Sequence, residues 1–80
     1  MIKIQSAEYC GNHQIQLTFS DGAQRVLDLH AYRSTRKGPL LDELEDENLA
    51  RQCYVDTGAL CWPNGLELAP APLYELQGAA

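Results

Sequence analysis

The sequence predicts an α+β fold: a small antiparallel sheet of about five or six short strands built from hairpins, with one or two short helices on one face. Two observations carry this prediction. Apolar and polar residues alternate with period two around turn-forming residues, and good helix formers occupy the middle of the chain. Since there is no linker and no internal repeat, residues 1–80 are expected to form a single compact domain.

Three antiparallel strands are expected before residue 30. Within HQIQLTF, Ile15, Leu17 and Phe19 fall on one face and the polar residues between them fall on the other. This pattern is typical of a half-buried strand. The flanking strands are expected in residues 2–9 and 24–29, which show the same alternation.

The turn between the second and third strands is expected to contain three residues, Ser20–Gly22. That length places Ile15 opposite Leu27, so two apolar side chains share a face. A two-residue turn, Asp21–Gly22, would instead place Ile15 opposite Asp28 and bury its carboxylate. The glycine is then explained by a left-handed backbone conformation and needs no ligand.

Residues 31–38, AYRSTRKG, are polar and basic and lack periodicity, so they are expected to form an exposed loop. Loops of this kind often carry binding residues. The candidate interaction residues are Tyr32, Arg33, Arg36 and Lys37.

Residues 39–53 contain good helix formers, and the break at Glu45–Asp46 predicts two short helical pieces. Asp46 is expected to cap the second piece. An apolar turn just before it is supplied by Leu40, Leu41 and Leu44.

The only tryptophan precedes a Pro-Asn-Gly turn, which raises the question of whether Trp62 is a recognition residue or a core residue. A three-residue turn sets Trp62 opposite Leu66 and Leu60 opposite Leu68, so the apolar pairs share one face. We therefore expect Trp62 in the core. Structural roles in turns and core are predicted for Asp21, Gly22, Trp62, Pro63, Asn64 and Gly65. A last helical turn is expected after Pro70.

The three cysteines are odd in number and widely spaced, which excludes a secreted disulfide framework and a structural zinc site. A three-residue turn at Asp56–Gly58 would place Cys53 opposite Cys61, and whether these two pair is left open. The start of the chain lacks a secretory signal, and no apolar run approaches the roughly 20 residues of a membrane span. The protein is expected in the cytoplasm.

Catalytic motifs are missing from the sequence: there is no phosphate-binding glycine loop, no serine elbow and no histidine-rich metal motif. Cys10 and His13 have local metal-ligand spacing but no evident further ligands. We therefore expect a protein that is not an enzyme and holds no cofactor or metal. The alternative is a small enzyme or ligand-binding protein that uses Cys61, His13 or the carboxylates of residues 42–47.

The formal net charge of −5 argues against direct nucleic-acid binding, because such domains generally present a basic face. A transcription-related accessory domain that uses Arg33, Arg36 and Lys37 is a second alternative. A protein partner is favoured, bound through the basic loop, exposed sheet edges or the acidic helix start. The sequence leaves a homo-oligomer, formed by pairing of edge strands, open.

Three segments carry a resemblance to a known family: LTFSDG (17–22), GPLLDEL (38–44) and WPNGLELAPAPLYE (62–75). In this order they resemble a small bacterial family, domain of unknown function 2442, over nearly the whole chain. The sequence departs from the family pattern at Ala69, where the family tends to have an aspartate cap, and at Glu67, where aspartate is usual. The last helix should therefore be weaker here.

The resemblance implies a compact α+β domain. Some members resemble the amino-terminal half of proteins with a DNA-binding helix-turn-helix. Others are similar to a product encoded beside a small partner protein, in an arrangement that looks like a toxin and antitoxin pair. The absence of catalytic motifs, the negative charge and the resemblance together lead us to expect a non-enzymatic protein-interaction module, with an antitoxin-like role as one form of it. The resemblance carries over no catalytic residue.

Overall fold

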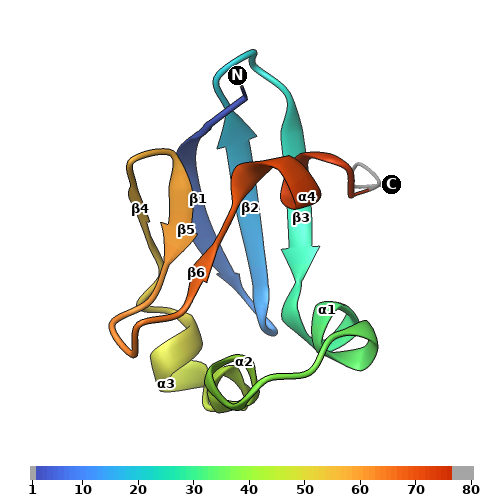
Figure 1. The fold of residues 1–80 in the computed structure, drawn as a ribbon, viewed down its shortest axis with the longest axis vertical. Helices are drawn as coiled ribbons and strands as arrows, with labels where there is room; N and C mark the ends of the chain where they lie inside the picture. The colour runs from blue at the N-terminus through green and yellow to red at the C-terminus, as the bar shows by residue number, and fades with distance from the viewer. Residues whose placement is uncertain (1, 77–80) are drawn as a thin grey trace.

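Two three-stranded antiparallel sheets lie face to face in the protein (Figure 1). The computed structural model describes residues 2–76. The first sheet is formed by β1 (Ile4–Gly11), β2 (Gln14–Phe19) and β3 (Gln24–Asp28), in that order. The second is formed by β4 (Tyr54–Asp56), β5 (Ala59–Cys61) and β6 (Glu67–Leu68).

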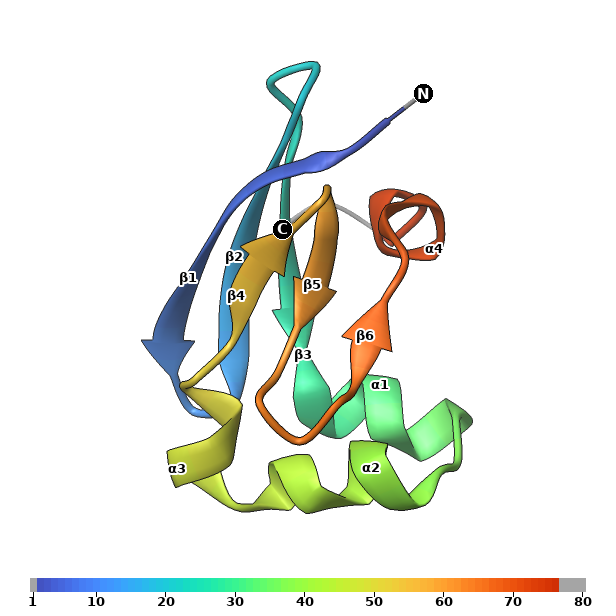
Figure 2. The same ribbon diagram turned by 60° about the vertical axis from the view of Figure 1, so that its left-hand side comes forward.

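Short helices close one end of the space between the sheets (Figure 2). They are α1 (Leu29–Thr35), α2 (Pro39–Asp42), the 3-10 helix η1 (Glu43–Glu45) and α3 (Glu47–Ala50). A further helix, α4 (Pro70–Tyr74), packs beside β3. The α+β class and the expectation of about six strands are confirmed, although the strands form two sheets instead of one. No helix within residues 2–76 is long and apolar enough to cross a membrane.

The register of the first sheet agrees with the predicted turn. Ile15 pairs with Leu27, and the N–H of Phe19 donates to the carbonyl of Ala23 at 2.8 Å. Gly22 has a φ of +90°, the left-handed conformation expected of it. The three-residue turn therefore keeps the carboxylate of Asp28 out of the core.

Asp28 has a second role that makes the expectation of a loop wrong over residues 31–35, while residues 36–38 do form a loop. Its carboxylate accepts hydrogen bonds from the backbone N–H groups of His30 and Ala31, at 2.9 and 3.3 Å, and thereby caps α1. The helix buries Leu29 and Tyr32, which lie three residues apart on one face. Burial of two large side chains outweighs the modest helix propensity of this segment.

The two helical pieces predicted after residue 38 are confirmed. Their break lies at Asp46, whose side chain accepts from the N–H of Asn48 at 2.9 Å and caps α3. Leu41 and Leu44 are buried, whereas Leu40 is 38% exposed. In α4, by contrast, Ala69 makes no side-chain cap, as its departure from the family pattern predicted.

The turn between β4 and β5 contains two residues and settles the relation of Cys53 to Cys61. Asp56 pairs with Ala59, so only Thr57 and Gly58 form the turn, both with positive φ. This two-residue turn places Tyr54 opposite Cys61. A three-residue turn at Asp56–Gly58 is therefore not formed, and Cys53 does not face Cys61.

The Pro-Asn-Gly hairpin has the predicted register, with Leu60 opposite Leu68 and the N–H of Trp62 donating to the carbonyl of Leu66 at 3.0 Å. Trp62 is 1% exposed, and its Nε1 donates to the carbonyl of Ala50 at 3.1 Å. The indole is thus a core residue that also joins the second sheet to α3. The other side chains that are completely buried with it include Ile15, Leu17, Phe19, Leu29, Leu44, Leu60 and Leu73.

Trp62→Ala is expected to lower the free energy of unfolding by about 3–5 kcal/mol, because it removes a large buried side chain and leaves a cavity. Trp62→Phe, which keeps an aromatic ring but leaves the Ala50 carbonyl without its donor, should cost about 1–3 kcal/mol. Urea denaturation followed by far-ultraviolet circular dichroism measures both. A loss below about 1 kcal/mol for the alanine variant would contradict core burial of Trp62.

Gly58 and Gly22 form a matched pair for a second stability measurement. Both have φ near +90°, but a Cβ at Gly58 would lie 2.9 Å from Cβ and Cγ of Lys3, whereas one at Gly22 meets nothing within 4 Å. Gly22→Ala should cost about 1–2 kcal/mol for the backbone conformation alone. Gly58→Ala should cost about 1–3 kcal/mol more, because the contact with Lys3 is overpacked. Equal losses of unfolding free energy in the two variants would show that the Lys3 side chain moves away from the new Cβ without destabilising the protein.

Candidate interaction surface

An apolar groove of about 470 Å³ lies between the α1–α2 connection and the edge strand β6. We call it the α2–β6 groove. One wall comes from α1, α2 and their connection, and the other comes from the Pro-Asn-Gly hairpin. The residues that line it are Tyr32, Arg36, Lys37, Gly38, Pro39, Leu40, Leu41, Leu66 and Leu68.

Tyr32 belongs to the core side of this groove. Only 8% of the residue is exposed, so it does not project from a loop as the sequence predicted. The guanidinium carbon of Arg36 lies 4.2 Å from the centroid of the Tyr32 ring, within the range of a cation–π contact. The buried ring thereby holds the Arg36 side chain at the border of the groove.

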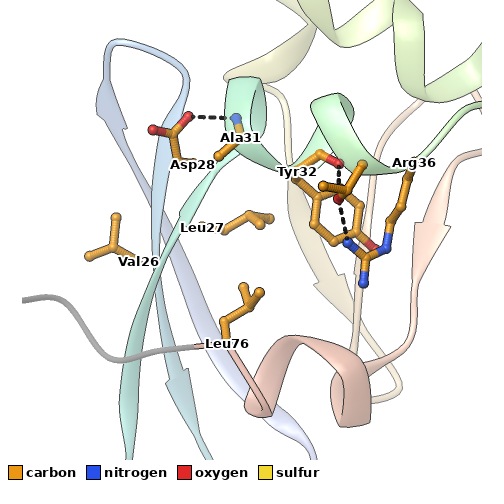
Figure 3. A pocket seen from close by; sticks show the side chains of 8 residues that line it. Val26, Leu27, Asp28, Ala31, Tyr32, Arg36 and Leu76 are labelled. Carbon is orange, nitrogen blue, oxygen red and sulfur yellow. Dashed lines mark hydrogen bonds between the residues drawn. The ribbon is translucent and has the colours of Figure 1, made fainter.

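Arg36 also borders two neighbouring hollows. One of about 210 Å³ lies between β3 and α1, where Leu27, Ala31 and Leu76 line it together with Arg36 (Figure 3). The other, of about 440 Å³, is formed against Pro72 and α4. Arg36 is therefore the residue shared by three adjoining depressions of the surface.

The predicted basic residues divide into two groups. Arg33 lies 3.5 Å from a carboxylate oxygen of Asp42 and 3.8 Å from one of Glu45, so its charge is directed toward the acidic segment. Arg36 and Lys37 line the groove and have no ion pair within the described residues 2–76. The structure thus brings Tyr32, Arg36 and Lys37 together and sets Arg33 apart from them.

Leu40, Leu66 and Leu68 line the groove, although the sequence did not predict them as binding residues. A signal for Leu40 exists in the sequence: Leu41 and Leu44 are three residues apart and can share the buried face of a helical turn, which leaves Leu40 outside it. No local signal places Leu66 and Leu68 beside Leu40, because this neighbourhood depends on the tertiary fold.

Asn64 connects the two walls of the groove. Its side-chain amide donates to the carbonyl of Leu40 at 3.2 Å and to a carboxylate oxygen of Glu43 at 3.1 Å. Its side-chain oxygen accepts from the N–H of Leu66 at 3.0 Å. The Pro-Asn-Gly turn therefore does more than reverse the chain: it positions β6 against α2.

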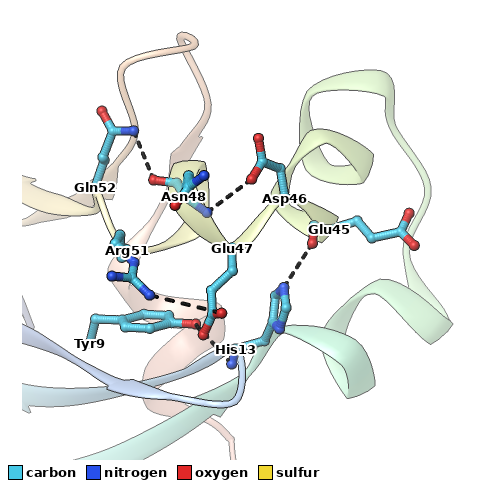
Figure 4. Close-up of polar contacts among 8 residues, drawn as sticks. All are labelled: Tyr9, His13, Glu45, Asp46, Glu47, Asn48, Arg51 and Gln52. Carbon is cyan, nitrogen blue, oxygen red and sulfur yellow. Dashed lines mark hydrogen bonds and ion pairs between the residues drawn. The ribbon is translucent and has the colours of Figure 1, made fainter.

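A separate polar cluster joins α3 to the turn between β1 and β2 (Figure 4). The hydroxyl of Tyr9 donates to Glu47 at 2.7 Å and accepts from the N–H of His13 at 3.0 Å. Nε2 of His13 lies 2.9 Å from the carbonyl of Glu45, and Arg51 lies 3.8 Å from Glu47. Burial, followed by the hydrogen bond to Glu47, raises the pKa of Tyr9 above its usual value. These contacts give His13 and the carboxylate of Glu47 a structural role, because they hold α3 against the turn between β1 and β2.

The cysteine and carboxylate residues considered for catalysis lie in different places. Cys61 contacts the carbonyl of Ala59 and the carboxylate of Glu67, each at 3.8 Å, and has no contact with His13. Burial, together with the nearby carboxylates of Glu67 and Asp56, raises the pKa of the Cys61 thiol, which disfavours the nucleophilic thiolate. Among residues 2–76 no group of three or more His, Cys, Asp or Glu side chains is placed to hold a metal ion.

The three cysteines are free thiols with graded exposure, and their alkylation is expected to follow that order. In native protein treated with iodoacetamide without reductant, exposed Cys10 should react first and half-buried Cys53 later. Buried Cys61 should react more than about tenfold more slowly than Cys10, because it requires local opening. Peptide mass spectrometry over time measures the three rates, with urea-unfolded protein as the control in which all three react. Faster labelling of Cys61 than of Cys10 would indicate an activated nucleophile.

Comparison with known proteins identifies one family. No curated protein and no solved structure matches the chain. Residues 4–78 match the model of a family described as "Protein of unknown function (DUF2442)". This range contains all three segments that carry the resemblance found in the sequence, including the Pro-Asn-Gly hairpin that builds one wall of the groove. The chain therefore belongs to the DUF2442 family.

Proposed function

We propose that the protein is a non-enzymatic interaction module that binds another protein through the α2–β6 groove. One observation carries the proposal: an apolar groove, with Leu40 38% exposed, is bordered by Arg36 and Lys37. An apolar centre within a charged rim is the usual anatomy of a protein–protein interface. Tyrosine and arginine are also enriched among residues that dominate binding energy.

The surroundings of the groove support an interface larger than the groove alone. The two further hollows that share Arg36 extend the uneven surface toward β3 and α4. A partner that reached across them would cover a wider area than a small molecule in one depression. Stable protein–protein interfaces bury roughly 800 Å² on each partner, so such an extension is needed.

The partner in this proposal is a small protein encoded beside this one, with this chain as the antitoxin-like member of the pair. The support is the resemblance of the sequence to family members in that arrangement. The separation of Cys61 from His13 and the raised pKa of its thiol support a binding role over a catalytic one. Because Arg33 is paired with Asp42 and Glu45, the adjacent basic residues left to bind an anion here are Arg36 and Lys37. Two positive charges are few for a protein that binds a phosphate backbone.

Leu40→Asp is the variant that tests the proposal, because it introduces a charge into the apolar groove. Tyr54→Asp is the matched control: Tyr54 is the other large apolar residue exposed in the described structure, at 48%, and it lies on β4 outside the groove. Affinity-tagged forms of the three proteins would be co-expressed with the product of the adjacent reading frame. Leu40→Asp should reduce its retention by about tenfold or more, a loss of at least about 1.4 kcal/mol, and Tyr54→Asp should leave it unchanged.

Melting curves by circular dichroism show whether each variant is folded at the temperature of the binding experiment. Retention of the neighbour by folded Leu40→Asp at the wild-type level would place the binding surface elsewhere. Failure of the wild-type protein to retain the neighbour would remove the adjacent reading frame as the source of the partner.

A further inference from the structure

The positive charges of this acidic protein are distributed unevenly over its surface. The formal net charge is −5, with six Lys and Arg residues. Arg33 and Arg51 are in ion pairs, and Arg25 donates to the Tyr74 carbonyl and lies over its ring. Lys3 covers the turn at Gly58. Within the described chain, adjacent cations without an ion pair therefore occur at Arg36 and Lys37, on the border of the groove.

From this distribution we infer that the α2–β6 groove receives an acidic segment of a partner protein, whose apolar side chains enter the groove and whose carboxylates contact Arg36 and Lys37. The inference rests on the proposed protein-binding function and names the chemistry of the partner. Arg36 is suited to a carboxylate because its guanidinium is already held against the Tyr32 ring, so little side-chain freedom is lost on binding. The flexible Lys37 supplies a second, less directional charge.

The lining of the groove distinguishes an acidic protein segment from other anionic ligands. Leu40, Leu66 and Leu68 offer apolar surface, which a phosphate backbone would leave uncovered. Pockets for small molecules enclose most of their ligand, whereas this groove is open to solvent and is bounded by an edge strand. A peptide segment that alternates apolar and acidic side chains satisfies both the leucines and the two cations.

A second copy of this chain is a poorer occupant, because its own acidic segment is already engaged. Asp42 and Glu45 pair with Arg33, and Glu43 accepts from Asn64. In the same segment Asp46 caps α3 and Glu47 contacts Tyr9 and Arg51. To place the carboxylates of Asp46 or Glu47 in the groove of a neighbour, each copy would have to give up contacts that cap α3 or hold it against β1.

Selection from a random library of displayed 12-residue peptides tests the inference whatever the identity of the natural partner. Wild-type protein is the target, and Leu40→Asp is used in parallel to remove peptides that bind elsewhere. Peptides that depend on Leu40 should combine Leu, Ile, Phe or Trp with several Asp or Glu residues. Synthetic, fluorescein-labelled copies of the selected peptides then provide the probes for fluorescence polarisation.

Two double variants with the same change in net charge separate local contact from general electrostatics. Arg36→Gln with Lys37→Gln removes two positive charges at the groove, and Gln5→Glu with Gln24→Glu adds two negative charges at exposed positions of β1 and β3. The groove variant should weaken peptide binding by about tenfold, and the control by less than about twofold. Binding to the wild type should also weaken as salt is raised.

The outcomes separate this inference from the proposed function. Leu40-dependent peptides that are neutral or basic, or equal losses in the two double variants, would overturn the acidic partner and leave the groove as a protein-binding site. If no selected peptide depends on Leu40, the inference fails as well. The proposed function is then still tested separately, by co-purification with the neighbouring gene product. Sedimentation that shows a dimer of the wild type but a monomer of the groove variant would identify a second copy as the occupant.

Discussion

Burial of the Trp62 indole in the hydrophobic core, which also contains side chains from both sheets, is the interaction on which the rest of the structure depends. The ring belongs to the same core cluster as Ile15, Leu17 and Phe19 of the first sheet, and its Nε1–H joins the hairpin of β5 and β6 to the carbonyl of Ala50 at the end of α3. With that hairpin fixed, Leu66 and Leu68 face the α1–α2 connection and complete the groove. A chain of 80 residues has a small core, so one side chain of this size supports a large share of the tertiary structure.

The parts of the fold that could be predicted from the sequence are those set by local rules. Pairing of Ile15 with Leu27 and of Leu60 with Leu68 follows from apolar alternation combined with turn length. The failure over residues 31–35 has its origin in a residue with two plausible roles, since Asp28 fits the end of a strand but also caps α1. Burial of Leu29 and Tyr32 selects the helix there, and a local pattern does not contain that information. The two-residue turn after β4 depends on a positive φ at Thr57, which its residue type does not suggest.

The candidate surface was predictable in its charges and not in its shape. Arg36 and Lys37 stand out in the sequence because they are adjacent and lie in a segment without apolar periodicity. The groove itself requires Leu40 and Leu66 to meet, although they lie far apart in the chain. Asn64 brings them together through hydrogen bonds to both segments, and a turn asparagine gives no indication in sequence of a partner so distant.

The bridge made by Asn64 also bears on how long the protein survives in a cell. Because the groove has one wall from the helical segment and one from the last hairpin, local opening of the hairpin separates the walls and exposes the chain to proteases. In the proposed complex, an occupant that contacts both walls binds the closed form and not the opened one. It would stabilise the closed form by about 2.7 kcal/mol at a free concentration about one hundred times its Kd. Degradation that proceeds through this opening would slow accordingly, so the abundance of the protein would follow that of its partner.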